Sequence, residues 1–435
     1  MLADLRLFGA DRPRVTLYRD SASWCPYCQK AWIALEERRV PYEVVRVDMR
    51  CYGEGKPAEF LRIQPSGNLP CAVIDGAVVA ESNDVVEAID EIGDQSTPRL
   101  RHEEGTADAE RVRHLCDDGR NSLERRLYAR WMWWLTGVRK PAEYKFLYEE
   151  HLDEVEEALA QSPGPFFLGK KISIVDVRFI PFMERQVATF AYFKGFNVRD
   201  QSRWPNLVRW LEAMESRPSY RATKSDWYTH SRALPPQLAA DCVFEAGHES
   251  MKASIDALPV SEDSGDASSQ RWREPGWGDG LLPRNVPAAR REAAERLIYN
   301  RERISIFACR GAGVPGLPAS SAPLADPRST PNESVAPAVD LMLRAVASAL
   351  LERGGREVSP PALGENAAVL ALSGGACGPD ACVAVADCLD YLRSRVGVPR
   401  DMSYPAATEF RSELQGLSGA LRFTTATSIS GGGGG

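Results

Sequence analysis

The chain has 435 residues, 44% of them hydrophobic and 26% charged, a composition typical of globular proteins, and a usual domain size of about 150 residues predicts roughly three folding units. The 60 acidic residues outnumber the 53 basic ones, and no uninterrupted apolar run reaches about 18 residues, so we expect neither nucleic-acid binding nor a membrane span. Ten cysteines are too few for a disulfide scaffold and indicate a reducing compartment.

Residues 14–94 alternate between strand-like and helix-like patterns. Asp75-Gly76 lies between two short apolar runs and is a strong hairpin signal. Pro26 suits the first turn of a helix, because its missing N–H needs no partner there. The expected strands are residues 15–18, 42–47, 71–74 and 77–79, and the expected helices are 26–38, 57–63 and one that starts at Ser82. The order βαβαββα predicts an α/β domain with a mixed four-stranded sheet that begins at Val15.

Residues 100–225 show only helical periodicity and predict an all-α domain. Leucines and tryptophans between Leu115 and Trp134 predict one long helix. Ser173 and Asp176 precede an apolar run at the spacing of a helix capping box, in which each side chain bonds the other residue's backbone N–H.

Beyond these domains the composition becomes rich in Ala, Gly, Ser and Pro. Residues 235–285 are expected to be a linker, because residues 261–270 have almost no apolar content. Residues 286–422 predict a helical extension with amphipathic helices at 288–310, 335–353, 382–396 and after Ser403. These helices could form a small core of their own or pack on the preceding domain. Residues 423–435 are expected to be a flexible tail.

A thiol pair, Cys25 and Cys28 in the run Trp-Cys-Pro-Tyr-Cys, lies where the first strand meets the first helix. A helix N-terminus lowers the pKa of a thiol, so we expect Cys25 to act as a nucleophile and Cys28 to resolve a mixed disulfide. Half a zinc site and a purely structural pair are the alternatives. Zinc needs two further ligands, and no histidine precedes His102, so we expect no metal here.

The Cys25–Cys28 motif, followed by Asn68-Leu69-Pro70-Cys71 and Glu81-Ser82, resembles the thioredoxin-like half of a cytosolic-type glutathione transferase. The helical stretch around Ser173 resembles that family's all-α C-terminal half, and together they cover residues 14–222. The nucleophile is similar to that of cysteine-type classes such as omega, lambda and dehydroascorbate reductase. The distal helices resemble the C-terminal extension of the iota class of photosynthetic organisms, which also carries a Cys-Pro-x-Cys centre.

The resemblance implies a glutathione site on five further residues. Leu69, before a cis Pro70, would pair its backbone with the extended tripeptide. Glu81 and Ser82 would hold the γ-glutamyl end, and Lys56 would pair with the glycyl carboxylate. Each has a structural alternative: Lys56 as a solvated surface charge, Ser82 as a helix cap alone, and Pro70 as an ordinary trans proline.

The resemblance further implies a glutathione-dependent thiol transferase or reductase, of the deglutathionylating or dehydroascorbate-reducing type, with glutathione as co-substrate. Its partner substrate would be a small molecule or a glutathionylated protein, and the expected assembly is a homodimer. A non-catalytic scaffold that binds through the extension is the alternative function. A weaker idea is an iron–sulfur cluster held by paired thiol centres across a dimer. The expected location is cytoplasmic, or the chloroplast if a transit peptide is missing from this chain.

Overall fold

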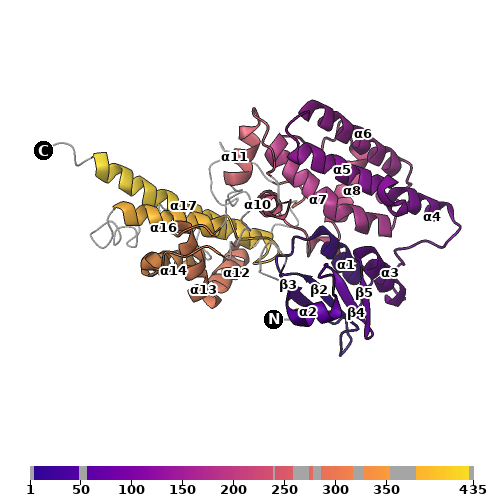
Figure 1. The fold of residues 1–435 in the computed structure, drawn as a ribbon, viewed down its shortest axis with the longest axis horizontal. Coiled ribbons are helices and arrows are strands. Elements are labelled where there is room, and N and C mark those ends of the chain that lie inside the picture. The colour runs from indigo at the N-terminus through magenta and orange to yellow at the C-terminus, as the bar shows by residue number, and fades with distance from the viewer. Residues whose placement is uncertain are drawn as a thin grey trace. The chain divides into compact units, whose positions relative to one another are not determined.

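The structure is a computed structural model of the chain, and it describes residues 4–48, 56–238, 241–257, 274–277, 286–316, 328–352 and 379–430. Its contacts divide the chain into two compact units, Met1–Lys252 and Ala253–Gly435 (Figure 1). The boundary falls in the segment expected to be a linker, within helix α11 (Glu249–Ala257). The polar stretch 261–270, on which the linker prediction depends, lies outside the described residues.

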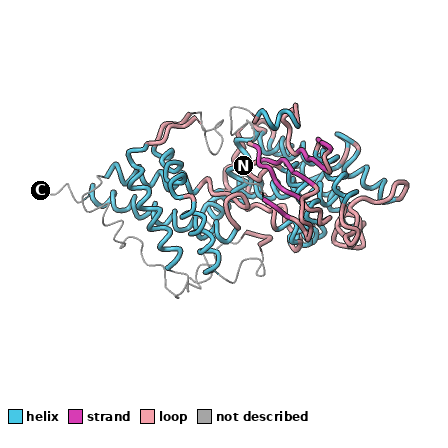
Figure 2. Tube along the Cα trace, turned by 90° about the horizontal axis from the view of Figure 1, so that it is seen from below, coloured by secondary structure: helices cyan, strands magenta, loops and turns pink. Residues whose placement is uncertain are grey.

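A mixed sheet with strand order β1-β3-β2-β4-β5 organises the first part of unit 1 (Figure 2). The strands are β1 (Asp4–Arg6), β2 (Val15–Asp20), β3 (Tyr42–Val47), β4 (Cys71–Ile74) and β5 (Ala77–Ala80). β2 runs parallel to β3 and antiparallel to β4, and β4 pairs antiparallel with β5. The predicted four strands are confirmed, but β1 was missed. It is a three-residue edge strand whose Leu5 is 57% exposed, so it carries no apolar pattern to detect.

Three helices accompany the sheet: α1 (Pro26–Glu37), α2 (Ala58–Ile63) and α3 (Ser82–Ile92). Successive side chains of a strand point to opposite faces, so Leu17 and Tyr18 of β2 face different layers. Tyr18 packs with Phe60 of α2, whereas α1 and α3 contact each other and cover the other face. The β4–β5 turn has positive φ at both Asp75 (47°) and Gly76 (89°), which is the backbone of the predicted tight hairpin.

The remainder of unit 1 is helical, as predicted. Its helices are α4 (Ala107–Val112), η1 (Arg113–Asp117), η2 (Gly119–Asn121), α5 (Leu123–Thr136), α6 (Pro141–Ala160), α7 (Ile174–Lys194), α8 (Pro205–Glu215), α9 (Pro218–Arg221) and α10 (Trp227–Leu238). The single long helix expected between Leu115 and Trp134 is wrong. The helical stretch is interrupted after Asp117: Asp118 has a ψ of 37°, and the next residue, Gly119, has a φ of 51°, which glycine adopts readily. Almost every side chain of α7 is buried, so this helix forms the centre of the unit.

Unit 2 has a hydrophobic core of its own. Its helices are α12 (Val286–Tyr299), α13 (Arg301–Ala308), η3 (Cys309–Ala312), η4 (Glu333–Val335), α14 (Ala336–Glu352), α16 (Pro379–Arg393) and α17 (Tyr404–Ser430). The helix expected at 288–310 is interrupted at Asn300, and α17 extends into the segment expected to be a tail. That extension contains neither Gly nor Pro between Ala420 and Ser430, so nothing in the sequence stops the helix there.

One helical stretch among the described residues, Glu333–Leu351, is long and apolar enough to cross a membrane by length and composition alone. This stretch is not an uninterrupted apolar run, because charged residues lie within it. Val339, Met342, Val346 and Leu350 of this stretch lie at helical spacing and are buried in the core of unit 2. A core helix meets the same criterion, so the finding is weak evidence for a membrane segment.

The capping box at the start of α7 is present and more extensive than predicted. The Asp176 carboxylate accepts hydrogen bonds from the Ser173 backbone N–H (2.8 Å) and hydroxyl (2.6 Å). It also accepts from the Phe167 N–H (3.1 Å) and the Trp210 indole (2.8 Å). One buried carboxylate thus joins the loop before α7, the helix itself and α8.

We therefore predict that Asp176→Ala lowers the free energy of unfolding of unit 1 by about 2–5 kcal/mol, because it leaves buried donors unsatisfied. Thr106→Ala is the matched control: Thr106 caps the exposed start of α4 with one hydrogen bond and should cost about 1 kcal/mol or less. Chemical denaturation followed by tryptophan fluorescence measures both, since eight of the ten tryptophans lie in unit 1. Equal losses in the two variants would contradict the prediction.

Candidate active site

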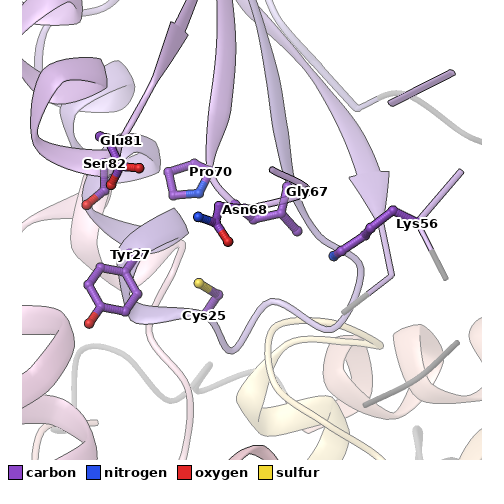
Figure 3. A pocket seen from close by; sticks show the side chains of 9 residues that line it. Cys25, Tyr27, Lys56, Gly67, Asn68, Pro70, Glu81 and Ser82 are labelled. Atoms are coloured by element: carbon purple, nitrogen blue, oxygen red, sulfur yellow. The ribbon is translucent and has the colours of Figure 1, made fainter. Parts of the chain in front are cut away.

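A cavity of about 430 Å³ opens in unit 1 at the ends of several sheet elements, a size suited to a small ligand. Its lining comes from the start of α1, the residue before the α2 cap, the loop that leads into β4, and the turn from β5 into α3 (Figure 3). The lining residues are Cys25, Tyr27, Lys56, Gly67, Asn68, Leu69, Pro70, Glu81 and Ser82. One cavity therefore combines a thiol, a cation and a carboxylate.

Six of the seven residues proposed from the sequence line this cavity: Cys25, Lys56, Leu69, Pro70, Glu81 and Ser82. Cys28 is not part of the lining and is buried at 1% exposure. Tyr27, Gly67 and Asn68 also line the cavity but were not proposed. Each is a sequence neighbour of a proposed residue, so position next to the motifs was the signal that could have found them.

Cys25 occupies the position that caps the N-terminus of α1, and its carbonyl accepts the Gln29 N–H (3.0 Å) as the first turn closes. Pro26 follows at the first helical position, where a missing N–H costs nothing. The Cys25 side chain is 6% exposed, and Figure 3 shows its sulfur pointing toward Asn68 and Pro70. The helix N-terminus adds partial positive charge and unpaired N–H groups at this end of α1.

Cys28 lies one turn further along α1, beneath Cys25. Burial raises the pKa of the Cys28 thiol well above its usual range, and a hydrogen bond with Cys25 raises it further. The two cysteines therefore differ in kind: Cys25 reaches the cavity, whereas Cys28 is an enclosed thiol that holds its proton.

Arg185 of α7 fixes the main chain just before Cys25. Its Nε (3.1 Å) and Nη2 (2.5 Å) both donate to the Trp24 carbonyl, and its Nη1 donates to the Gln29 side chain (2.8 Å). The guanidinium is buried, and it places a positive charge within electrostatic range of Cys25. Sequence reasoning missed Arg185, because nothing in the pattern of α7 shows which residue faces α1.

The loop into β4 brings backbone and a cation to the cavity. The peptide between Leu69 and Pro70 is cis, as the resemblance implied. Lys56 donates from Nζ to the Asp48 carbonyl (2.5 Å), so its ammonium is held close to the chain. A Cβ on Gly67 would lie 3.3 Å from the Lys56 Cγ, and the φ of +70° at Gly67 also favours glycine.

The turn from β5 into α3 presents a carboxylate and a hydroxyl. Glu81 has a φ of 65°, an uncommon backbone conformation for a residue other than glycine, and precedes the first residue of α3. Ser82 is that first residue, so the cap position belongs to Glu81 and not to Ser82 as expected. The unpaired N–H groups at the start of this 11-residue helix can bind an anion.

Three aromatic residues of α5 divide into two groups. Trp131 and Trp134 are buried at 1% exposure and belong to the core. Tyr128 packs edge-on against Phe182, which also contacts Tyr27 of the cavity lining.

Asp20 adds a third potential metal ligand beside the two thiols. Ligand atoms of Asp20, Cys25 and Cys28 lie within 4.8 Å of one another, the one such group found in the part of the chain that the structure describes. Three potential ligands are one fewer than the four protein ligands of a structural zinc site.

Comparisons with known proteins agree with this architecture. Residues 24–92 match the family model for the glutathione S-transferase N-terminal domain, and residues 147–213 match that for the glutathione S-transferase C-terminal domain. Glutathione S-transferase DHAR3, chloroplastic, of Arabidopsis thaliana is 24% identical over 202 residues, 46% of this chain and 69% of that protein. Glutathione S-transferase L1 of the same plant is 28% identical over 207 residues, 46% of this chain and 79% of that protein.

A solved structure, the dehydroascorbate reductase of Chlamydomonas reinhardtii, is 21% identical with a TM-score of 0.39, over 48% of this chain and 91% of that chain. The matched segments and the sheet topology agree on the fold: unit 1 contains a thioredoxin-like domain with a mixed sheet, followed by an all-helical domain. Some relatives carry "chloroplastic" in their names and one carries "cytosolic".

Beside Arg185, Glu184 joins the helical domain to α1. Its carboxylate accepts from the Gln29 side chain (3.0 Å), the Ser225 N–H (2.8 Å) and His230 Nε2 (2.7 Å). Burial alone would raise the pKa of Glu184, but the hydrogen bond and charge of His230, with Arg185 and Ser225, lower it to about 2.

A carboxylate with a lowered pKa stabilises the fold above its ordinary pKa, and this contribution is lost as the pH falls through the folded value. We therefore predict that unit 1 loses about 3 kcal/mol of stability to Glu184 protonation between about pH 4.5 and pH 2. Glu184→Gln should lower stability at neutral pH and flatten this acid dependence. Glu150→Gln, an exposed carboxylate on α6, is the control. Urea denaturation across this pH range measures the free energy of unfolding of the wild type and of both variants. If that free energy depended on pH as steeply in Glu184→Gln as in the wild type, the prediction would be overturned.

Proposed function

We propose that the chain is a glutathione-dependent thiol transferase or reductase in which Cys25 is the nucleophile. The observation that carries the proposal is the position of Cys25: it caps α1 and faces a cavity whose other residues can bind a charged tripeptide. The relatives include glutathione S-transferases named DHAR3, DHAR2 and L1, and the resemblance to the dehydroascorbate reductase class favours reductive chemistry.

The cavity provides groups for each part of glutathione. The Ser82 hydroxyl and the N–H groups of α3 would bind the γ-glutamyl carboxylate, and Glu81 would pair with its ammonium. The backbone at Leu69 would pair with the extended peptide, and Lys56 would pair with the glycyl carboxylate. Bound in this way, the tripeptide places its sulfur on the Cys25 side of the cavity.

The reaction is thiol–disulfide exchange. The Cys25 thiolate attacks the glutathione sulfur of a glutathionylated substrate, the substrate thiolate leaves, and a mixed disulfide remains on Cys25. A second glutathione then attacks the glutathione sulfur of the mixed disulfide, which frees the Cys25 thiolate and gives oxidised glutathione. Alternatively, Cys28 attacks the Cys25 sulfur, which forms a Cys25–Cys28 disulfide and releases reduced glutathione. Reduction is favoured over conjugation, because tyrosine or serine hydroxyls activate bound glutathione whereas a cysteine becomes the nucleophile itself.

The first test is Cys25→Ser with Cys28→Ser as its matched partner. Cys25→Ser should reduce thiol transfer to a glutathionylated peptide, and reduction of dehydroascorbate, to near the uncatalysed rate. Cys28→Ser should keep activity when glutathione is in excess, because glutathione can resolve the mixed disulfide. Unchanged activity in Cys25→Ser would overturn the mechanism, and a wild-type chain inactive on both substrates would favour the scaffold alternative.

The second test concerns the glutathione site. Ser82→Ala should raise the KM for glutathione by about tenfold with a smaller effect on kcat, because a hydrogen bond to a charged group contributes about 1.5–3 kcal/mol. Ser216→Ala, an exposed serine after α8 that does not line the cavity, is the control and should change neither constant. Steady-state kinetics at varied glutathione concentration measure both. A fall in kcat alone would argue that Ser82 does not bind glutathione.

A further inference from the structure

Asp20, at the end of β2, is fully buried yet has one carboxylate oxygen that the fold leaves unsatisfied. Its Oδ2 accepts the Trp24 N–H (2.8 Å). Its Oδ1 has no hydrogen-bond partner within the described ranges, and the residue is 0% exposed. A buried acceptor without a partner costs about 1–3 kcal/mol, and more if charged, so its presence calls for an explanation.

The surroundings of this carboxylate are the two thiols of the site. A carboxylate oxygen of Asp20 and the sulfur atoms of Cys25 and Cys28 lie within 4.8 Å of one another. Arg185 of α7 is the cation within electrostatic range of both Asp20 and Cys25. The neighbouring Arg19 donates from Nη1 to the Asp20 main-chain carbonyl and to Ser23 Oγ.

The enclosed thiol presents a chemical problem. Cys28 must lose its proton to attack a disulfide, because the thiolate is the reactive form. Its sulfur is 1% exposed and does not line the cavity, so bulk water is poorly placed to take the proton. Burial and the hydrogen bond with Cys25 raise the pKa of the Cys28 thiol, which makes unaided ionisation rarer still.

We propose that Asp20 is the proton acceptor for Cys28 in the resolving step. This inference rests on the proposed function, in which Cys25 carries a mixed disulfide. As Cys28 attacks the Cys25 sulfur, its proton moves to Asp20 and a Cys25–Cys28 bond forms. The bond from Cys25 to the glutathione sulfur breaks, and glutathione leaves as a thiolate that takes up one proton. The Cys28 sulfur is oxidised, the glutathione sulfur is reduced, and no other oxidant or reductant is needed.

A purely structural role for Asp20 is the competing explanation, since Oδ2 holds the Trp24 N–H in the turn before the nucleophile. Asp20→Asn separates the two roles. The amide oxygen of asparagine can still accept the Trp24 N–H, but an amide cannot take the thiol proton at neutral pH. Asp20→Glu provides the complementary variant, because it keeps a carboxyl group at the site.

The test uses an aromatic disulfide, dithionitrobenzoate, with the reduced full chain under stopped flow. The attack of Cys25 releases one coloured thionitrobenzoate anion, and resolution by Cys28 releases a second. In Asp20→Asn we expect the first release to stay within about threefold of wild type and the second to slow by about 10²-fold at pH 7. The second rate of this variant should then rise about tenfold per pH unit, as free hydroxide replaces the missing base. Asp20→Glu should recover at least part of the second rate.

Controls separate failure of the inference from failure of the proposed function. Cys28→Ser should abolish the second release alone, and Cys25→Ser should abolish the fast first release. If Cys25→Ser retains the fast first release, the proposed function fails. If the first release depends on Cys25 but the second is unchanged in Asp20→Asn, the role of Asp20 is overturned. Equal slowing of both releases, or a second rate in Asp20→Glu as slow as in Asp20→Asn, would show that Asp20 only positions the turn.

Discussion

The contact between the Arg185 guanidinium and the Trp24 carbonyl is the interaction on which the geometry of the thiol centre depends. A loop residue before a helix would otherwise be free to change its backbone angles, and the Cys25 sulfur would move with it. Two donors from one rigid, planar group hold that carbonyl in place. The same guanidinium bonds Gln29 in the second turn of α1, so it fixes both sides of the nucleophile.

Through these contacts, side chains of the helical domain hold helix α1 of the thioredoxin-like domain in position. Arg185 and its neighbour Glu184 both bond Gln29, and the next residue, Lys30, pairs with Glu124 of α5 at 3.2 Å. Such buried charges contribute little net stability, but removing one partner leaves the other charge buried and unpaired, which is strongly destabilising. The sheet positions the start of α1, and charges from the second domain hold its orientation. A thioredoxin-like domain separated from its helices would therefore keep the sequence motif but lose the support of the reactive turn.

The parts of the fold that local chemistry decides were the parts the sequence predicted well. The strand-to-helix cysteine motif, the Asp75-Gly76 turn and the Ser173–Asp176 cap each depend on residues close in sequence. Contacts between distant segments left no such pattern. Arg185 reaches Trp24 across 161 positions, and its helix is buried on nearly all sides, so periodicity could not indicate which face meets α1. Asp20 was missed for a related reason: as the last residue of a buried strand, it becomes informative only when its oxygen is seen beside two thiols.

The different burial of the two cysteines also determines the order of events at the site. Cys25 lines the cavity and Cys28 does not, so in the proposed mechanism a bulky disulfide substrate would form its mixed disulfide on Cys25. Exchange at sulfur proceeds with the attacking and leaving sulfurs on opposite sides of the central one. Cys28 is buried, whereas Cys25 lines the cavity, so in that mechanism the leaving glutathione would depart into the cavity proposed to bind it. In the proposed mechanism, burial of Cys28 therefore has two opposite effects: it disfavours loss of the thiol proton, but it places the sulfur on the side of Cys25 from which attack is productive. A buried proton acceptor such as Asp20 would offset the first effect without removing the second.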